Sequence, residues 1–595
     1  MPELIAVLRP KPAVLSLSVQ AELATPDRQR SWFEILVRHF FTRFFHNELI
    51  TSDDGDARRI MIVAYAFALP GLLVALFLYP AYHGFPPNPL VRPFWAQTSD
   101  HYFYVMYSFI VMGAATVYEW DLLFPDLLDV FVLSVLPIDK RHLFFARVLA
   151  LAIFLGLVLL GTSGLGIIFF SIFTEAPPIL LHYLAHITAV LASGAFAAAT
   201  FLALQGILLN TVGENIFRRI TPLLQGASVL LLLTILLLTP TITHSLQPLL
   251  NSSSPAVRYF PPFWFLGIYE RILAGPSALP IFHQLARNGC IALLIALAIT
   301  LLTYPLAYRR RVRQLIEGGT AVRSKRHSAT LLHRILHATI LRVPAQRAIF
   351  HFISQTILRA QKQRVMLAMY GGLAIALAVS SMLIIRVEGG HAHPTLTPDG
   401  IRAATPILIF WTIAGLSSIF SSSIDRRGAW IFRTIHGRPG LSHLAGARIW
   451  IISIAILIGL TSAALLHTLS PDTLRTPTRT AMQLIAAFGI PFLLANLFLF
   501  PTRTIPFTHT RQSSITDLPL VVIRYFILFP IFISMLLSEE KWMERRSINL
   551  TKELIILTVI LLLIRARYVR NIRQSPLDTG LEDPDAFPQS LGLRD

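Results

Sequence analysis

The sequence has few of the residues that carry covalent, redox or metal chemistry. Cys290 is its only cysteine, so neither an intrachain disulfide nor a cluster of thiolate metal ligands can form. The G-x-x-x-x-G-K-[ST] phosphate loop is absent, and we do not expect this chain to hold ATP in the Walker manner. The H-E-x-x-H and G-x-S-x-G motifs are absent as well. We therefore expect no catalytic residue, metal site or cofactor in this chain.

Charged residues are also scarce. They make up 14% of the chain against 54% hydrophobic residues, and the mean hydropathy of +0.62 excludes an ordinary soluble domain of this length. Acids are outnumbered by bases, 32 to 51, which leaves a net charge of +19. In a soluble protein such an excess could indicate a nucleic-acid partner. Here we attribute it to loops that face an anionic inner leaflet, and we expect the partner to be the lipid bilayer and not nucleic acid.

Many apolar runs reach the roughly 20 residues that are needed to cross about 30 Å of hydrocarbon. They predict an all-α polytopic membrane protein with about twelve transmembrane helices. The predicted spans are approximately Ile60–Tyr79, Phe103–Tyr118, Leu143–Phe173, His182–Val212, Pro222–Thr241, Ile291–Tyr308, Val365–Ile385, Pro406–Ser422, Ile449–Leu469, Met482–Phe500, Leu518–Leu537 and Leu554–Ile564.

The distribution of basic residues predicts the orientation. Segments before the first span and after every second span are basic, so both termini should be cytoplasmic. Arg309 to Arg364 holds thirteen Lys or Arg residues against one acid and should be a cytoplasmic bridge. The first 58 residues lack the pattern of a cleavable signal peptide. We expect a multi-pass protein of a bacterial plasma (inner) membrane.

A constant spacing indicates an internal duplication. Arg59 and Arg364 precede the first and seventh spans and are 305 residues apart, as are Leu143 and Arg448 at the third and ninth. Six spans per half give two parallel halves. The expected units are a leader with an interfacial helix (1–58), a first six-span half (59–308), a bridge with a second interfacial helix (309–364), a second six-span half (365–567) and a cytoplasmic tail (568–595).

An amphipathic helix is expected before each half. From Ser31 to Asn47 aromatic and aliphatic residues recur near helical spacing with basic residues between them, as in a helix lying in the headgroup plane. A helix packed on a soluble core is the alternative. The segment Arg347–Arg359 corresponds to it in the second half.

The hairpin from Glu119 to Arg147 is the most distinctive polar stretch. It lies between two apolar runs and contains four carboxylates, then Pro137, then the cluster Asp139-Lys140-Arg141. A looser copy, Asp425-Arg426-Arg427, occurs in the second half. A charged hairpin present twice suggests a docking surface. The alternative is an ordinary cytoplasmic loop that follows the positive-inside rule.

These residues resemble the permease subunits of type 2 ABC exporters. The resemblance is carried by Leu136 to Arg141, by Leu143 to Arg147, by the interfacial helix before the first span and by a long outer connection before the sixth. It implies a coupling hairpin that docks a separate ABC-type ATP-binding subunit, which would hold ATP and Mg. The implied docking residues are Glu119, Asp121, Asp139, Lys140 and Arg141, with Asp425, Arg426 and Arg427 in the second half.

Other readings stay open. Charged residues deep in the spans are few, Arg524 being the clearest, which favours energy supplied from outside the membrane domain over ion coupling. A membrane-embedded transferase would need outer-loop carboxylates such as Glu388, Asp399 or Asp472, and a non-transporting scaffold would need none. His391 and His393 form at most a weak metal site. The sequence does not identify the substrate or its binding residues.

Overall fold

The structure is a computed structural model of the 595-residue chain. It describes residues 32–43, 56–83, 92–120, 123–125, 127–134, 138–173, 179–212, 214–252, 255–316, 337–338, 341–388, 391–420, 441–469, 477–498, 506–507, 517–546 and 550–574.

The chain is built almost entirely of helices. Up to residue 316 they are α2 (Trp32–Arg43), α3 (Asp56–His83), α4 (Phe94–Tyr118), α5 (Leu127–Ser134), α6 (Lys140–Phe173), α7 (Ile179–Thr211), α8 (Glu214–His244), α9 (Leu246–Asn251), α10 (Pro255–Tyr259), α11 (Pro261–Ala274), the 3₁₀ turn η1 (Gly275–Ser277) and α12 (Pro280–Ile316). The rest are α14 (Pro344–Arg359), α15 (Gln361–Met382), α16 (Pro398–Phe420), α18 (Leu441–Leu469), α19 (Pro477–Phe498), α20 (Asp517–Arg546) and α21 (Leu550–Gln574), with strands β1 (Leu383–Glu388) and β2 (His391–Leu396).

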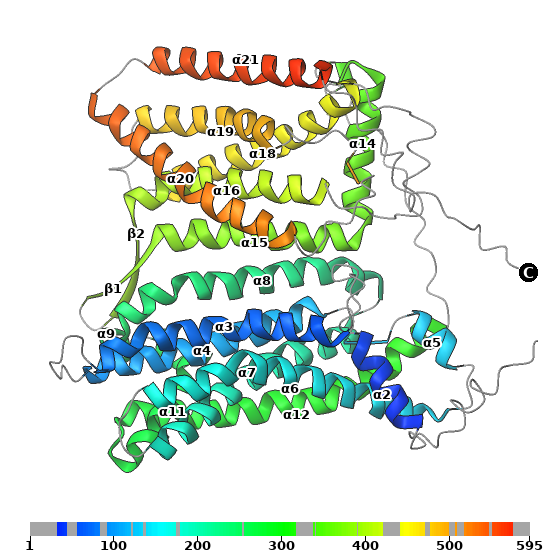
Figure 1. Cartoon of the computed structure of the whole chain (residues 1–595), viewed down its shortest axis with the longest axis vertical. Coiled ribbons are helices and arrows are strands. Elements are labelled where there is room, and N and C mark those ends of the chain that lie inside the picture. The colour runs from blue at the N-terminus through cyan, green and yellow to red at the C-terminus, as the bar shows by residue number, and fades with distance from the viewer. Residues whose placement is uncertain are drawn as a thin grey trace, which may run out of the picture.

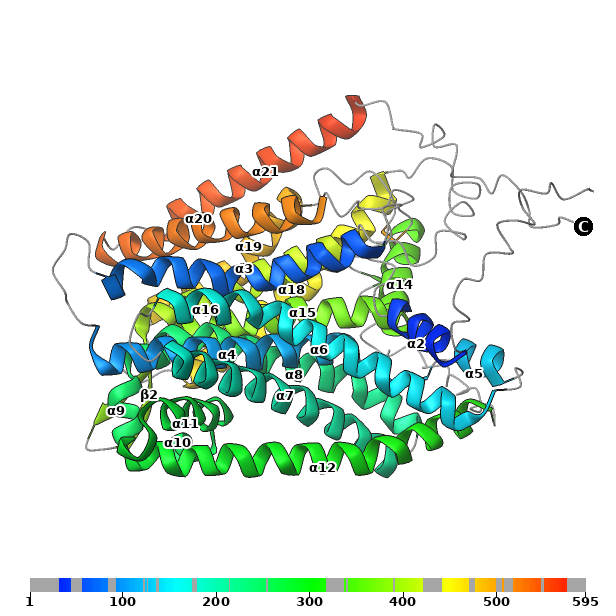
Figure 2. The same ribbon diagram turned by 60° about the horizontal axis from the view of Figure 1, so that its bottom comes forward.

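The long helices lie side by side and run between two ends of the molecule (Figure 1). One end carries α2, α5 and α14 together with the start of α6 and the arginine-rich end of α12, and we call it the basic end. The opposite end carries α9, α10, α11 and the two strands (Figure 2). The amphipathic helices α2 and α14 and the two strands therefore lie at opposite ends of the molecule.

Several helices are suited to lipid. Within the described residues seven helices are long and apolar enough to cross a membrane, in α6, α7, α8, α12, α16, α18 and α19. The spanning window of α12 is only 17% buried, and Leu301 and Leu302 on it are 74% and 69% exposed. Water would make such an apolar surface costly, whereas hydrocarbon makes it favourable. The chain is a helical, polytopic membrane protein.

The buried residues form two cores. The first runs from Leu36 to Ala307 and the second from Ile349 to Tyr525. They meet where α8 packs along α15, and Cβ of Ala368 lies 2.9 Å from where a Cβ on Gly226 would be. We call this the α8–α15 seam.

Helix pairings recur in the two parts of the chain. The helix α2 packs on α6 as α14 packs on α18, and α4 packs on α7 as α16 packs on α19. The pairings of α3 and α15 differ, because α3 packs on α6 whereas α15 packs on α16 and α8.

Both amphipathic helices expected from the sequence are present, as α2 and α14. Each presents an apolar face to a neighbouring long helix: Leu36 and Phe40 of α2 are buried, as are Ile349, Ile353 and Ile357 of α14. A hydrogen bond of 2.8 Å from the Trp450 indole to Ser354 Oγ ties α14 to α18.

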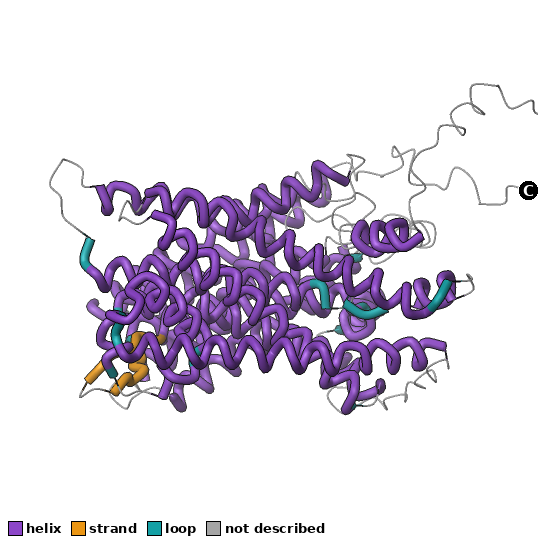
Figure 3. The backbone as a smooth tube through the Cα atoms, turned by 90° about the horizontal axis from the view of Figure 1, so that it is seen from below, coloured by secondary structure: helices purple, strands orange, loops and turns teal. Residues whose placement is uncertain are grey.

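A two-stranded antiparallel sheet departs from the expected all-helical path. The sequence predicts a span that continues to Ile385, but α15 ends at Met382 and the chain then pairs Arg386 with His393. The run Leu-Ile-Ile-Arg-Val is rich in β-branched residues, which favour a strand where the helix has left its packed environment. The strands lie at one corner of the bundle, at the end opposite the basic end (Figure 3). Within the described part of the chain no group of three or more metal-ligating side chains is found there or elsewhere.

A candidate docking groove at the basic end

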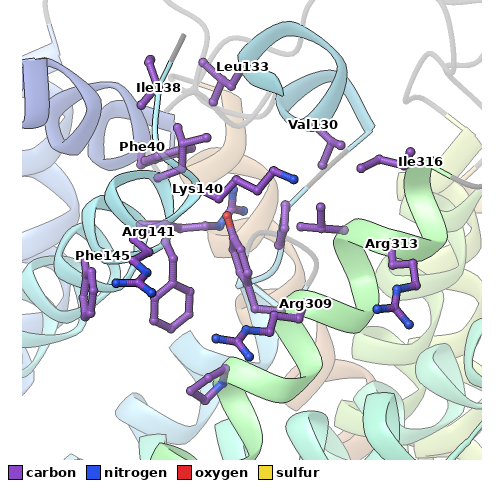
Figure 4. A pocket seen from close by; sticks show the side chains of 17 residues that line it. Phe40, Val130, Leu133, Ile138, Lys140, Arg141, Phe145, Arg309, Arg313 and Ile316 are labelled. Carbon is purple, nitrogen blue, oxygen red and sulfur yellow. The ribbon is translucent and has the colours of Figure 1, made fainter. Parts of the chain in front are cut away.

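A groove with a volume of about 790 Å³ opens at the basic end (Figure 4). Its walls come from four helices: α2 contributes Phe40, α5 contributes Val130 and Leu133, the start of α6 runs along one side, and the end of α12 along the other. Segments far apart in the sequence, near residues 140 and 310, therefore face one another across it.

The described charged residues that line the groove have one sign. They are Lys140, Arg141, Arg147, Arg309 and Arg313, and none of the described lining residues is acidic. Lys140 and Arg141 are exposed. Their like charges repel one another, so an occupant that brings negative charge is favoured.

The remaining walls of the groove are apolar. Phe40, Leu133, Ile138 and Phe144 line it, and Phe145 is 59% exposed beside them. Exposed aromatic groups next to arginines are typical of the centres of protein interfaces. A partner surface with carboxylates around an apolar centre would fit such a groove.

Asp139 starts the helix that forms one wall. Its Oδ1 accepts a hydrogen bond of 3.1 Å from the backbone N–H of Arg141, so it caps α6, which begins at Lys140. The carboxylate is still 59% exposed and His142 lies 4.0 Å from it. By capping the helix, Asp139 thus fixes where α6 begins and where Lys140 and Arg141 lie on its first turn.

Arg147 joins three elements behind the groove. Its side chain is buried, its Nη2 donates a hydrogen bond of 2.5 Å to the carbonyl oxygen of Phe124, and its guanidinium lies 5.2 Å from the centre of the Phe40 ring. The contact with Phe40 connects α6 to α2, and the hydrogen bond connects α6 to the segment that follows α4.

Two further side chains hold that same segment. The Tyr304 hydroxyl on α12 donates to the carbonyl oxygen of Leu123 at 2.7 Å, and Gln205 Nε2 on α7 donates to the carbonyl oxygen of Trp120 at 2.7 Å. Trp120 and Leu123 are themselves fully buried. Three long helices thus hold three carbonyls of residues 120–124, a set that we call the carbonyl clamp.

The electrostatics of the clamp extend to α2. Partial burial lowers the pKa of the His39 side chain, and the positive charges of Arg43 and Arg147 lower it further. Protonating His39 therefore works against the packing of α2 at this end.

The residues expected to dock a partner do not all lie at the groove. Asp139, Lys140 and Arg141 lie together at the groove, whereas Glu119 is buried at the end of α4. Asp121, Asp425, Arg426 and Arg427 lie outside the described residues. Sequence reasoning did not assign Tyr304, Gln205 or the groove-lining Arg309 and Arg313 to this surface.

The missed residues left little signal in the sequence. A tyrosine or glutamine inside an apolar run is common, and only the fold brings Gln205 to Trp120 or Tyr304 to Leu123. Arg147 was visible in the sequence only as a basic residue that opens an apolar run.

The fold and the groove define a helical membrane protein with a basic, aromatic-rimmed surface at one end. Comparisons with protein-family models, curated proteins and solved structures give no match to this chain.

Proposed function

We propose that this chain is the membrane-embedded permease of an ATP-driven exporter, which forms the translocation path and docks a separate ATP-binding subunit at the basic end. The basic end would face the cytoplasm of a bacterium, with both termini on that side. The transmembrane region would consist of two parallel six-span halves. The recurrent pairings of α2 with α6 and of α14 with α18, and the two hydrophobic cores, support this division.

The observation that carries the proposal is the carbonyl clamp behind the groove. A docking surface transmits force only if it is fixed to the elements that must move. Here the segment between α4 and α5 is held by side chains of α6, α7 and α12, so a displacement at the groove reaches three long helices directly. An ordinary loop would need no such attachment.

The charge of the groove supports a particular partner surface. Five basic side chains and no acid among the described lining residues favour an acidic face with an apolar centre on the ATP-binding subunit. The exported substrate would be moved by energy that the partner supplies, since this chain has no phosphate loop.

A charge-reversal experiment tests the proposal. The tagged wild-type protein is purified from its native membrane, and co-purifying ATP-binding proteins are quantified together with the ATPase activity of the sample. The Lys140→Glu/Arg141→Glu variant should reach the membrane at normal abundance but lose the ATPase, because like charges across an interface cost several kcal/mol whereas exposed substitutions cost about 0.5 kcal/mol of stability.

The matched control is Arg258→Glu/Arg271→Glu, which reverses two exposed arginines at the opposite end. It should retain the full complement of ATPase. Two results would contradict the proposal. Either the wild-type protein carries no ATP-binding partner, or the groove variant retains that partner fully.

A further inference from the structure

A second pocket lies at the end of the molecule opposite the groove. Its volume is about 340 Å³, and its walls are the start of α4, the end of α11, η1 and the start of α12. Phe94, Trp95 and Phe282 supply aromatic surface, and Glu270 supplies the one charged side chain among the described lining residues. The described charge in this pocket is thus negative, whereas that in the groove at the basic end is positive.

Glu270 is almost completely buried, with 3% of its surface exposed. Its Oε1 lies 2.7 Å from Nδ1 of His101, a ring that stacks on Tyr269 with centroids 4.1 Å apart. Within the described part of the chain Oε2 of Glu270 accepts no hydrogen bond, and this oxygen keeps some exposed surface. The second carboxylate oxygen is therefore open to the pocket that Glu270 lines.

The arginine just before α4 is already paired with another carboxylate. Arg92 makes two hydrogen bonds to Asp100, of 2.5 and 2.7 Å, and Tyr82 donates a third at 2.9 Å to the same carboxylate. Asp100 precedes His101 on α4, so Arg92 is held at that residue and is not a lining residue of the pocket. None of the described residues that line the pocket is a lysine or an arginine.

We propose that this pocket binds an ammonium group. A carboxylate held in an apolar surround is stabilised by a cation that enters beside it. Aromatic faces attract such a cation through their quadrupoles, and a weakly hydrated alkylammonium loses little hydration on entry. An anion would meet Glu270 directly, and a neutral ligand would gain nothing from it.

Two sources supply this chemistry. A free solute such as choline carries it, and so does the headgroup of a choline or ethanolamine phospholipid. The site lies where α4 and α12 begin, at an end of the bundle, so a headgroup and a dissolved amine can both reach it. The inference concerns the recognition of the ammonium group, and it does not depend on the proposed docking of an ATPase.

The test uses the full chain purified in dodecyl maltoside, a detergent without charge. Intrinsic tryptophan fluorescence and calorimetry follow titrations with choline chloride, with 3,3-dimethylbutan-1-ol and with dihexanoylphosphatidylcholine. The alcohol has the shape of choline without its charge. Choline should bind saturably and the alcohol roughly tenfold or more weakly, a difference that needs no variant.

The Glu270→Gln variant keeps the shape of the side chain and a hydrogen-bond acceptor for His101, and it should weaken choline binding roughly tenfold. Trp95→Leu, which removes an aromatic wall and leaves the carboxylate, should weaken it as well. The matched control is Asp399→Asn, an exposed carboxylate at the start of α16 that does not line the pocket.

The two ligand sources are separated by their ranking. Tighter binding of dihexanoylphosphatidylcholine than of choline identifies a lipid headgroup, and the reverse ranking identifies a free amine; both support the ammonium site. Equal binding of choline and its neutral analogue, unchanged choline binding by a folded Glu270→Gln variant, or no saturable binding of any ammonium probe would overturn it.

Discussion

The Arg147 guanidinium donates a hydrogen bond of 2.5 Å to the carbonyl oxygen of Phe124, a residue 23 positions earlier in the chain. This contact is made in a buried setting, and it attaches the segment after α4 to the helix that follows the hairpin. This hydrogen bond joins the two arms of the hairpin. Lys140 and Arg141, which lie between them in the sequence, remain exposed.

The first prediction concerns this contact. Replacing Arg147 by Leu should lower the free energy of unfolding by about 2 kcal/mol, because the Phe124 carbonyl loses its donor and Phe40 loses its cation. Thermal unfolding of the purified protein, followed by tryptophan fluorescence, measures the effect. The exposed Arg141→Leu serves as control and should change the midpoint little. Equal midpoints for both variants would contradict the role given to Arg147.

The second prediction separates docking from coupling. Tyr304→Phe removes one hydroxyl from the clamp, which costs about 1 kcal/mol and leaves the groove surface intact. The variant should therefore retain the ATPase but transport less substrate for each ATP hydrolysed, as measured in reconstituted vesicles.

Tyr259→Phe is the matched control for that experiment. Tyr259 is 77% exposed at the end of α10, far from the groove, and its hydroxyl makes no hydrogen bond within the described residues. Its variant should behave as wild type. A normal transport ratio in Tyr304→Phe would show that the clamp does not transmit the docking event.

The third prediction concerns pH. The pKa of His39 in the folded protein lies below its usual 6.5, so at lower pH the unfolded state binds more protons than the folded state. Stability should therefore be unaffected by His39 above that value and fall as the pH decreases below it. The unfolding midpoint should drop between about pH 7.5 and about pH 5.5 by more in wild type than in His39→Gln. Parallel pH profiles would refute this assignment.

The fourth prediction concerns orientation. In a Cys290→Ser background, an impermeant maleimide applied to intact cells should label a cysteine at Ser277 but not one at Arg342, since both positions are exposed and lie at opposite ends. Permeabilised cells should allow labelling of both. Labelling of position 342 in intact cells would invert the topology and remove the groove from the cytoplasm.

Much of the fold could be predicted from the sequence because lipid imposes a simple rule on it. Apolar runs of spanning length become helices, and the amphipathic segments before residues 59 and 364 give α2 and α14. The exposed charges Asp139, Lys140 and Arg141 were recognised because they are contiguous. The strand pairing of Leu383–Glu388 was missed, since a short apolar run fits a helix end and a strand equally well.

Contacts between distant segments could not be predicted in the same way. His101 and Glu270 are 169 residues apart, and nothing in either neighbourhood indicates that they meet. The arginines at the end of α12 were recognised as basic, but only the packing of α12 beside α5, α7 and the hairpin turns them into a wall of the groove.

The α8–α15 seam has a mechanical consequence. The two helices approach each other closely, because Gly226 faces Ala368 and Gly372 lies against the backbone of Leu230. Small residues at such an interface let two helix backbones approach closely and pack tightly, so the two cores are joined there by backbone-to-backbone packing. A larger side chain at Gly226 would meet Ala368 at less than ordinary contact distance, so it would force the two helices, and with them the two cores, further apart.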